Sequence, residues 1–184
     1  EKACVIGGGT GVTTGEMAAL EGRKKSEVAE ISRAVIEAWP LFDAGNLAAS
    51  KSPKVEVRRG DAYRTLLRSE GPIDLIVSEP SNPWVTGIEM LYSREFLEAC
   101  RDRLTPGGVH AQWLHSYETN TETLALLLRT YQSVFEHSSL WFTVGTDLVL
   151  IGVNDPEAAF DIARLQRRFD QPDFTVGFAR AKLV

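Results

Sequence analysis

The chain has few of the residues that characterise disulfide-rich, zinc-binding or membrane-spanning proteins. Its two cysteines, Cys4 and Cys100, lie far apart in apolar segments, and we expect them to be buried, reduced thiols. The three histidines have no cysteine partners at zinc-ligand spacing, so we expect no metal site. No apolar run approaches the roughly 20 residues that span a bilayer.

Positive charge is also scarce. The net charge of −5 argues against a broad surface for nucleic acid. Hydrophobic residues make up 43% and charged residues 24% of the 184 positions, which is ordinary for one globular domain with a real core. No signal peptide is visible, and Glu1 and Lys2 lead directly into an apolar strand. We therefore expect a cytoplasmic domain, without a nucleic-acid partner, that is part of a longer protein.

Segments typical of strands and helices alternate along the chain. The expected strands cover 3–6, 28–31, 54–58, 73–77 and 109–114, and the expected helices cover 13–21, 32–39, 62–68, 93–104 and 121–134. Helical crossovers between strands imply parallel pairing. Two last strands, 140–144 and 148–153, are separated by only three residues, which permits an antiparallel hairpin and no parallel crossover.

This order predicts an α/β fold: a doubly wound, Rossmann-like, mostly parallel seven-stranded sheet that ends in an antiparallel hairpin, as in the class I methyltransferase fold. We assign residues 1–155 to a nucleotide-binding catalytic domain of the S-adenosylmethionine type. A last helix over 156–169 and an unassigned tail to residue 184 are expected to belong to the same domain.

The first motif reads Gly-Gly-Gly-Thr-Gly and lies between the first strand and a helix. Glycines at this place let the backbone turn tightly and let a ligand come close. No Gly-Lys-Ser/Thr follows, so the motif is not a Walker A loop. A tight turn without a ligand is the alternative to a nucleotide site. The predicted cofactor-binding residues of this loop are Gly7, Gly8, Gly9, Thr10 and Gly11.

An acidic residue lies at the end of the second expected strand and another just after the third. Glu30 comes about 20 residues after the glycines, where a carboxylate can accept hydrogen bonds from both ribose hydroxyls. Asp61, followed by Ala62, comes after the third strand, where a carboxylate can accept a hydrogen bond from an adenine amino group. Asp61 can also be the N-cap of the next helix. We expect Glu30, Asp61 and Ala62 to contact the nucleotide; a surface position is the alternative for Glu30.

A proline-rich loop, Ser-Glu-Pro-Ser-Asn-Pro-Trp over 78–84, follows the fourth strand. Ligands of such sheets bind at the carboxyl ends of parallel strands, and two prolines stiffen this loop. We predict Glu79 and Asn82 as catalytic residues, with Glu79 also beside the cofactor. Trp84 is either a substrate wall or a loop anchor. His115, after the fifth strand, is more typical of a strand-end histidine than of a base.

Taken in order, these motifs resemble the polyamine aminopropyltransferases, the spermidine synthases and their relatives. The resemblance covers about residues 3–153 and includes Leu-Tyr-Ser at 91–93 and Leu-Thr-Pro-Gly-Gly-Val at 104–109. It is strongest with bacterial spermidine synthase-like proteins, some of which are fused to membrane transporter-like segments. It implies S-adenosylmethionine or its decarboxylated form as cofactor, a small-molecule amine acceptor and a homodimer. It is also compatible with membrane segments elsewhere in the full-length protein.

The resemblance also implies a mechanism. An amine of putrescine attacks the carbon beside the sulfonium of decarboxylated S-adenosylmethionine, and an acidic loop after the fourth strand takes the amine proton. The sulfonium leaving group is already activated, so no metal is needed.

Three departures from the family pattern concern the substrate. Thr10 stands where the family usually has Asp, which helps to select the decarboxylated cofactor. Asn82 stands where the strand-four loop usually has a second Asp. Each lost charge-assisted hydrogen bond to a cationic diamine is worth about 1.5–3 kcal/mol. The small N-terminal β domain of the family is absent from this sequence.

Three other functions stay open. A methyltransferase using S-adenosylmethionine is one, because Asn82-Pro83-Trp84 is similar to the Asn-Pro-Pro-aromatic loop of amino-methylating enzymes. A second is a binding or regulatory domain of a membrane-associated protein that has no turnover. A nicotinamide-dependent dehydrogenase is the third, and the terminal hairpin argues against it.

Overall fold

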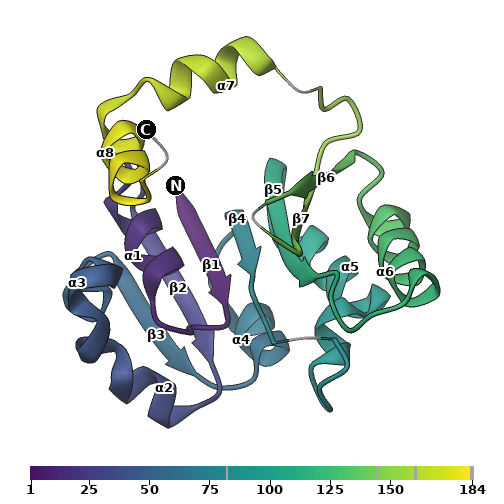
Figure 1. The fold of residues 1–184 in the computed structure, drawn as a ribbon, viewed down its shortest axis with the longest axis horizontal. Helices are drawn as coiled ribbons and strands as arrows, with labels where there is room; N and C mark the ends of the chain where they lie inside the picture. Colours follow the sequence, from purple (N-terminus) through teal and green to yellow (C-terminus); the bar gives the residue numbers. More distant parts are fainter. Residues whose placement is uncertain (82, 144, 160, 183–184) are drawn as a thin grey trace.

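A computed structural model of the chain describes residues 1–81, 83–143, 145–159 and 161–182. Its strands form one sheet in the order β3-β2-β1-β4-β5-β7-β6 (Figure 1). The strands are β1 (Lys2–Ile6), β2 (Lys25–Glu30), β3 (Val55–Arg59), β4 (Ile73–Ser78), β5 (Leu104–His115), β6 (Ser138–Phe142) and β7 (Asp147–Val153). Pairs among β1 to β5 are parallel. Strand β7 lies antiparallel between β5 and β6. The predicted seven-stranded sheet with a terminal antiparallel hairpin is confirmed.

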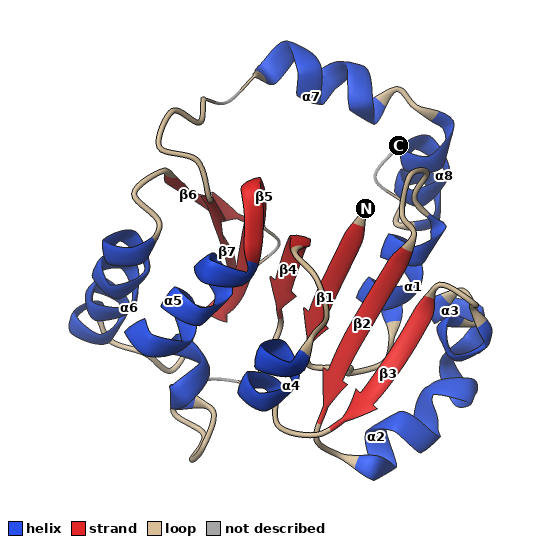
Figure 2. Ribbon diagram, turned by 180° about the vertical axis from the view of Figure 1, so that it is seen from behind, coloured by secondary structure: helices blue, strands red, loops and turns tan. Residues whose placement is uncertain are grey.

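Helices cover both faces of this sheet (Figures 1 and 2). The helices of the chain are α1 (Val12–Ala19), α2 (Arg33–Ala38), α3 (Asp43–Asn46), α4 (Ala62–Arg68), α5 (Arg94–Arg103), α6 (Thr121–Val134), α7 (Ile162–Phe169) and α8 (Pro172–Arg180), with 3₁₀ turns η1 (Trp39–Phe42), η2 (Ala49–Lys51) and η3 (Glu89–Tyr92). Helix α7 lies apart from the sheet and contacts α8 (Figure 1). None of the described helices is long and apolar enough to cross a membrane.

Strand β1 shows why the sheet has two cores. Successive side chains of a strand point to opposite faces. Ala3 and Val5 pack in one cluster with residues of α1 and η1, whereas Cys4 and Ile6 pack in the other with residues of α4, α5 and α6. Four consecutive apolar residues of β1 are therefore buried, as expected for a central parallel strand.

The helix starts follow their capping residues. The Ser93 hydroxyl accepts a hydrogen bond from the Phe96 amide, and Asp61 and Asn120 cap α4 and α6 in the same way. The predicted N-cap role of Asp61 is thus confirmed, and Asp61 and Ser93 fix where α4 and α5 begin.

The C-terminal segment differs from the expectation. The helix predicted over 156–169 was wrong at its start: Asp155 accepts backbone hydrogen bonds in a turn, and α7 begins only at Ile162, capped by Asp161. The unassigned tail contains α8, which starts at Pro172. Helix α8 returns to α1, where Arg180 pairs with Glu16 at 2.6 Å (Figure 1). Val144, expected at the end of a strand, lies outside the described residues.

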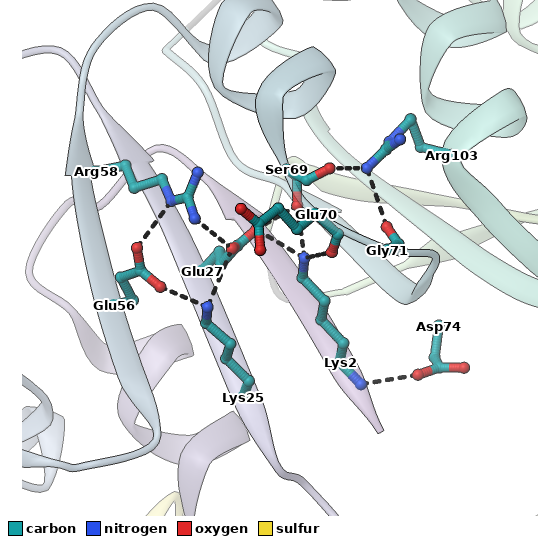
Figure 3. A network of polar contacts seen from close by, with 10 residues as sticks. All are labelled: Lys2, Lys25, Glu27, Glu56, Arg58, Ser69, Glu70, Gly71, Asp74 and Arg103. Atoms are coloured by element: carbon teal, nitrogen blue, oxygen red, sulfur yellow. Dashed lines mark hydrogen bonds and ion pairs between the residues drawn. The ribbon is translucent and has the colours of Figure 1, made fainter.

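A buried ionic network lies near the start of β1 and β2 (Figure 3). The Glu27 carboxylate is fully buried and pairs with Lys2 at 3.1 Å, Arg58 at 2.9 Å and Lys25 at 3.4 Å. It also accepts a hydrogen bond from Ser69, just after α4. This network ties β1, β2, β3 and the end of α4 together on the face opposite α1.

His110 on β5 is a titratable group inside the core. Its ring stacks on Phe135 at 5.2 Å between centroids, and its Nδ1 lies 3.1 Å from the Tyr131 hydroxyl. In the described part of the chain, Nε2 is buried without a hydrogen-bond partner. Burial lowers the pKa of His110 from its ordinary 6.5 to about 3, so the ring is neutral at pH 7.

This burial predicts a loss of stability in mild acid. Between the two pKa values the unfolded chain binds a proton that the folded chain does not, so the stability supplied by neutral His110 is present above pH 6.5 and falls as the pH decreases. From pH 7 to pH 5 the free energy of unfolding should fall by about 2 kcal/mol more in the wild type than in His110→Gln. Urea denaturation at both pH values measures this difference. Equal losses of stability in the two proteins would show that folding does not lower the pKa of His110.

Candidate functional site

The carboxyl ends of β1, β2, β3 and β4 border a cavity of about 620 Å³. Of the predicted site residues, it is lined by Gly7, Gly9, Glu30, Asp61, Ala62 and Glu79. Apolar walls come from Ile31 and Val35 on one side and from Met90, Leu91 and Phe96 on the other. The structure thus brings residues from four separate loops into one apolar cavity with a few polar groups, the usual form of a small-molecule site.

The glycine loop approaches the strand-four loop closely. Gly7 has a φ of +88°, and a Cβ there would lie 2.6 Å from the carbonyl oxygen of Glu79. Any other residue would clash with that backbone and be strained, so glycine is required at this position. Gly9 also faces the cavity, whereas Gly8 is buried beneath it.

Glu30 is held firmly at the end of β2. Its Oε2 accepts a hydrogen bond of 2.8 Å from the Gly8 amide, and its Oε1 accepts one of 2.7 Å from the Ser32 amide. The residue is only 8% exposed, yet it lines the cavity. Because backbone groups fix both oxygens, the carboxylate is preorganised to accept further hydrogen bonds from a ligand.

Two residues that the sequence did not single out donate hydrogen bonds to the backbone carbonyls of the glycine loop. The buried Trp39 indole donates to the Gly9 carbonyl at 3.1 Å. The Asn46 amide donates to the carbonyls of Thr10 at 3.0 Å and of Trp39 at 3.1 Å. Asn46 is fully buried although polar, and its amide is satisfied by these two carbonyls. Helix α3 also contains Asp43, so the local sequence did not mark Asn46 as a buried residue.

Asp61 has the predicted double role available to it. Its Oδ1 accepts the Arg64 amide at 2.9 Å as the N-cap of α4, and the side chain is exposed at the cavity. Ala62, the first residue of α4, lies beside it in the lining. One carboxylate oxygen can therefore cap the helix while the other faces a ligand.

Glu79 is exposed at the opposite end of the cavity, directly after β4. Its Oε2 accepts a hydrogen bond of 2.7 Å from the hydroxyl of Thr13 on α1. Asn82, the second predicted catalytic residue, lies outside the described residues, so its role stays a prediction. The Tyr92 hydroxyl lies 3.3 Å from the carbonyls of both Ser81 and Trp113, which joins the strand-four loop to β5.

The remaining candidates lie apart from this cavity in the described structure. Thr10 and Gly11 are outside its lining, and the Thr10 side chain is exposed. Trp84 lines a second, smaller cavity of about 430 Å³ against α6 and contacts Tyr117 edge-to-face. His115 Nδ1 lies 2.7 Å from Asp147, a strand-end contact between β5 and β7. Among the described residues, no group of three or more His, Cys, Asp or Glu side chains could hold a metal ion.

If the cavity binds the nucleotide that the sequence predicts, Glu30→Ala is expected to weaken the binding of adenosyl compounds by about 1–3 kcal/mol, through loss of charge-assisted hydrogen bonds to the ribose. Titration calorimetry with S-adenosylmethionine measures the change. Glu37→Ala, which removes an exposed carboxylate of α2 paired with Arg33, should bind like the wild type. Equal affinity of a folded Glu30→Ala variant would show that the ribose lies elsewhere.

Comparisons with known proteins identify the family of this chain. The spermine/spermidine synthase domain family matches residues 1–149. The chain is 30% identical over 135 residues to the polyamine aminopropyltransferase of Nitrosomonas europaea, covering 73% of this chain and 41% of that protein. It is 28% identical over 149 residues to putrescine N-methyltransferase 1 of Nicotiana tabacum, covering 79% and 40%. The chain spans less than half the length of these curated relatives.

Solved structures show the same fold. A spermidine synthase in complex with the transition state analogue AdoDATO superimposes with a TM-score of 0.79 at 20% identity, covering 100% of this chain and 70% of that one. Human methyltransferase-like protein 13 in complex with SAH superimposes with a TM-score of 0.76 at 16% identity, covering 95% and 80%. Since the family match covers most of the sequence, the chain belongs to the spermine/spermidine synthase domain family.

Proposed function

We propose that the chain is a transferase that binds S-adenosylmethionine or its decarboxylated form and transfers an aminopropyl group to a small amine. The observation that carries the proposal is the convergence of Gly7, Glu30, Asp61 and Glu79 on one cavity of about 620 Å³. A nucleoside needs a close backbone approach, an acceptor for its ribose hydroxyls and an acceptor for its adenine amine, which Gly7, Glu30 and Asp61 in turn would supply.

The residues present fit an adenosyl sulfonium compound. Glu30, with both oxygens fixed by backbone amides, would accept the ribose hydroxyls. Asp61 and Ala62 would hold the adenine edge between the apolar walls. When bound, the sulfonium compound supplies an alkyl carbon that an amine can attack without further activation.

Glu79 would accept the proton that the acceptor amine must lose as its nitrogen forms the new bond. A carboxylate positioned near a reacting amine is a suitable general base, and the exposed side chain faces the cavity from the end opposite Asp61. The hydrogen bond from the Glu79 amide to the Ile6 carbonyl would keep the backbone of Glu79 in place, which lowers the entropic part of the barrier.

Methyl transfer is the second candidate. Thr10 leaves the glycine loop without the acid that helps the family to select the decarboxylated cofactor, and several relatives are named putrescine N-methyltransferases. The loss of acids at Thr10 and Asn82 also predicts a weakened preference for cationic diamines. We therefore expect little activity of the ordinary spermidine synthase type.

The extent of the binding unit is part of the proposal. Residues 1–155 would form the binding domain, and 156–184 would belong to it. A contact of α8 with the turn after α1 supports this, because the Glu21 amide donates to Asp173 at 2.9 Å. A homodimer, and membrane segments elsewhere in a longer protein, stay predictions.

Calorimetry with S-adenosylmethionine, its decarboxylated form and NAD tests the cofactor, and product analysis with putrescine tests the reaction. Aminopropylated product would support the first candidate, and methylated product the second. Tight binding of NAD and of neither sulfonium compound would contradict both. Turnover at about 1 s⁻¹ or more with putrescine and the decarboxylated cofactor would refute the expected weak activity.

A further inference from the structure

Glu79 is fixed through its backbone by β1. Its amide donates a hydrogen bond of 2.9 Å to the Ile6 carbonyl, which continues the pairing of β4 with β1 beyond the end of the strand. The carbonyl oxygen of Glu79 packs so closely on Gly7 that a Cβ at Gly7 would lie only 2.6 Å from it. The main chain of Glu79 therefore has little freedom, and only the rotamer of its side chain remains to be set.

A side-chain contact sets that rotamer. Thr13 Oγ1 donates to Glu79 Oε2 at 2.7 Å, across 66 positions of sequence. Glu79 is exposed, so without this contact the carboxylate would be free to sample several rotamers. A short hydrogen bond to an ionised acceptor is stronger than one between neutral groups, which suits it to hold a side chain against solvent.

The start of α1 places Thr13 for this contact. Gly11 is the N-cap with a φ of +80°, so the chain turns sharply out of the glycine loop and Thr13 falls in the first turn of the helix. Side chains of a helix tilt toward its N-terminus, which here is the direction of the strand-four loop. The next residue, Thr14, is fully buried, so the two threonines of this turn have different surroundings.

We propose that Thr13 is a positioning residue for Glu79, the proposed proton acceptor. By holding Oε2, Thr13 turns the carboxylate so that Oε1 is presented to the amine. This inference rests on the proposed function. It assigns the hydroxyl of Thr13 an effect on the chemical step that is separate from binding of the donor.

The test compares Thr13→Val, which keeps the shape and removes the hydroxyl, with Thr13→Ser, which keeps the hydroxyl. In Thr13→Val we expect kcat to fall about ten-fold, while the KM values for donor and amine change less than about two-fold. Thr13→Ser should recover most of kcat. Thr14→Val, on the same helical turn, is the matched control and should keep the wild-type kcat.

A second readout does not depend on turnover. In protein labelled with ¹³C at the glutamate carboxyls, the Glu79 resonance is the one that is missing from Glu79→Gln. We expect Thr13→Val to move that resonance and Thr13→Ser and Thr14→Val to leave it near its wild-type position.

The outcomes separate the two proposals. An unmoved Glu79 resonance in Thr13→Val, or an unchanged kcat, would overturn the role of Thr13. A fall in kcat that Thr13→Ser does not recover would also overturn it, because the hydroxyl would then not be the cause. Absence of turnover in the wild type with both sulfonium donors would refute the proposed function, and the resonance would still report whether Thr13 holds Glu79.

Discussion

Glu79→Gln is expected to lower turnover by about 10²–10⁴-fold, the range in which a positioned general base contributes to proton transfer. Glutamine has nearly the shape of glutamate, and its amide oxygen can still accept the hydrogen bond from Thr13. It cannot accept the proton of the amine. The binding of the adenosyl donor should change little, because Glu30 and Asp61 at the other loops supply its polar contacts in the proposed arrangement.

Steady-state kinetics with the preferred donor and amine, together with calorimetry on the donor alone, measure both parts of this expectation. Glu98→Gln is a suitable control, because Glu98 is a surface residue of α5 paired with Arg94 and should leave kcat unchanged. Turnover of Glu79→Gln within about three-fold of the wild type would contradict a proton-accepting role and point to solvent as the base.

The fold was largely predictable because its signals are local. Four consecutive apolar residues in β1, buried on both faces, predict a central parallel strand. The short connection between the last two strands leaves only an antiparallel hairpin, and β7 does pair antiparallel with β6. Such constraints come from chain geometry alone, so they do not depend on knowing the rest of the structure.

Strand β2 was expected to begin at residue 28, yet it begins at Lys25. Its first half, Lys-Ser-Glu, looks like solvent-exposed loop because a buried glutamate is rare without partners. The partners of Glu27 come from β1, β3 and the end of α4. These partners are far from Glu27 in the sequence, so the local pattern around Glu27 cannot reveal the contacts.

The candidate site also combines features that local signals predict with contacts between distant segments that they do not. Gly7, Glu30, Asp61 and Glu79 each lie at or just after the carboxyl end of a strand, so the topology of a doubly wound sheet was enough to predict that they meet. Their supporting contacts were not predictable. Trp39 and Asn46 hold the glycine loop from turns whose conformation has no simple sequence signature.

Replacing Glu27 with glutamine should destabilise the fold by about 3 kcal/mol, near the lower end for removing one partner of a buried ion pair. The lower end applies because Arg58 and Lys25 are partly exposed and also pair with Glu56. Lys2, at 15% side-chain exposure, would lose its charged partner in the network (Figure 3). Because Glu27 and Glu30 belong to the same strand, the substitution should also affect, indirectly, how Glu30 is placed at the cavity.

The effect should depend on pH in a defined direction. Burial acts to raise the pKa of Glu27, but hydrogen bonds from Ser69 and Lys2 and the charges of Lys2 and Arg58 outweigh it, so the pKa lies below its ordinary 4.5. A carboxylate with a depressed pKa stabilises the fold above its ordinary pKa, and that stabilisation is lost as the pH falls through the depressed value. The difference between wild type and Glu27→Gln should therefore be full at pH 7 and shrink below pH 4.5.

Urea denaturation at pH 7 and in acid measures this difference, and Glu56→Gln is its matched control. Glu56 pairs with the same Lys25 and Arg58, but its side chain is 43% exposed, so its loss should cost at most about 1 kcal/mol. Equal destabilisation by the two substitutions would mean that burial of Glu27 gives it no special weight. If Glu27→Gln were instead as stable as the wild type, desolvation of the carboxylate would have cancelled its ion pairs, and the network would serve to orient β2 rather than to stabilise it.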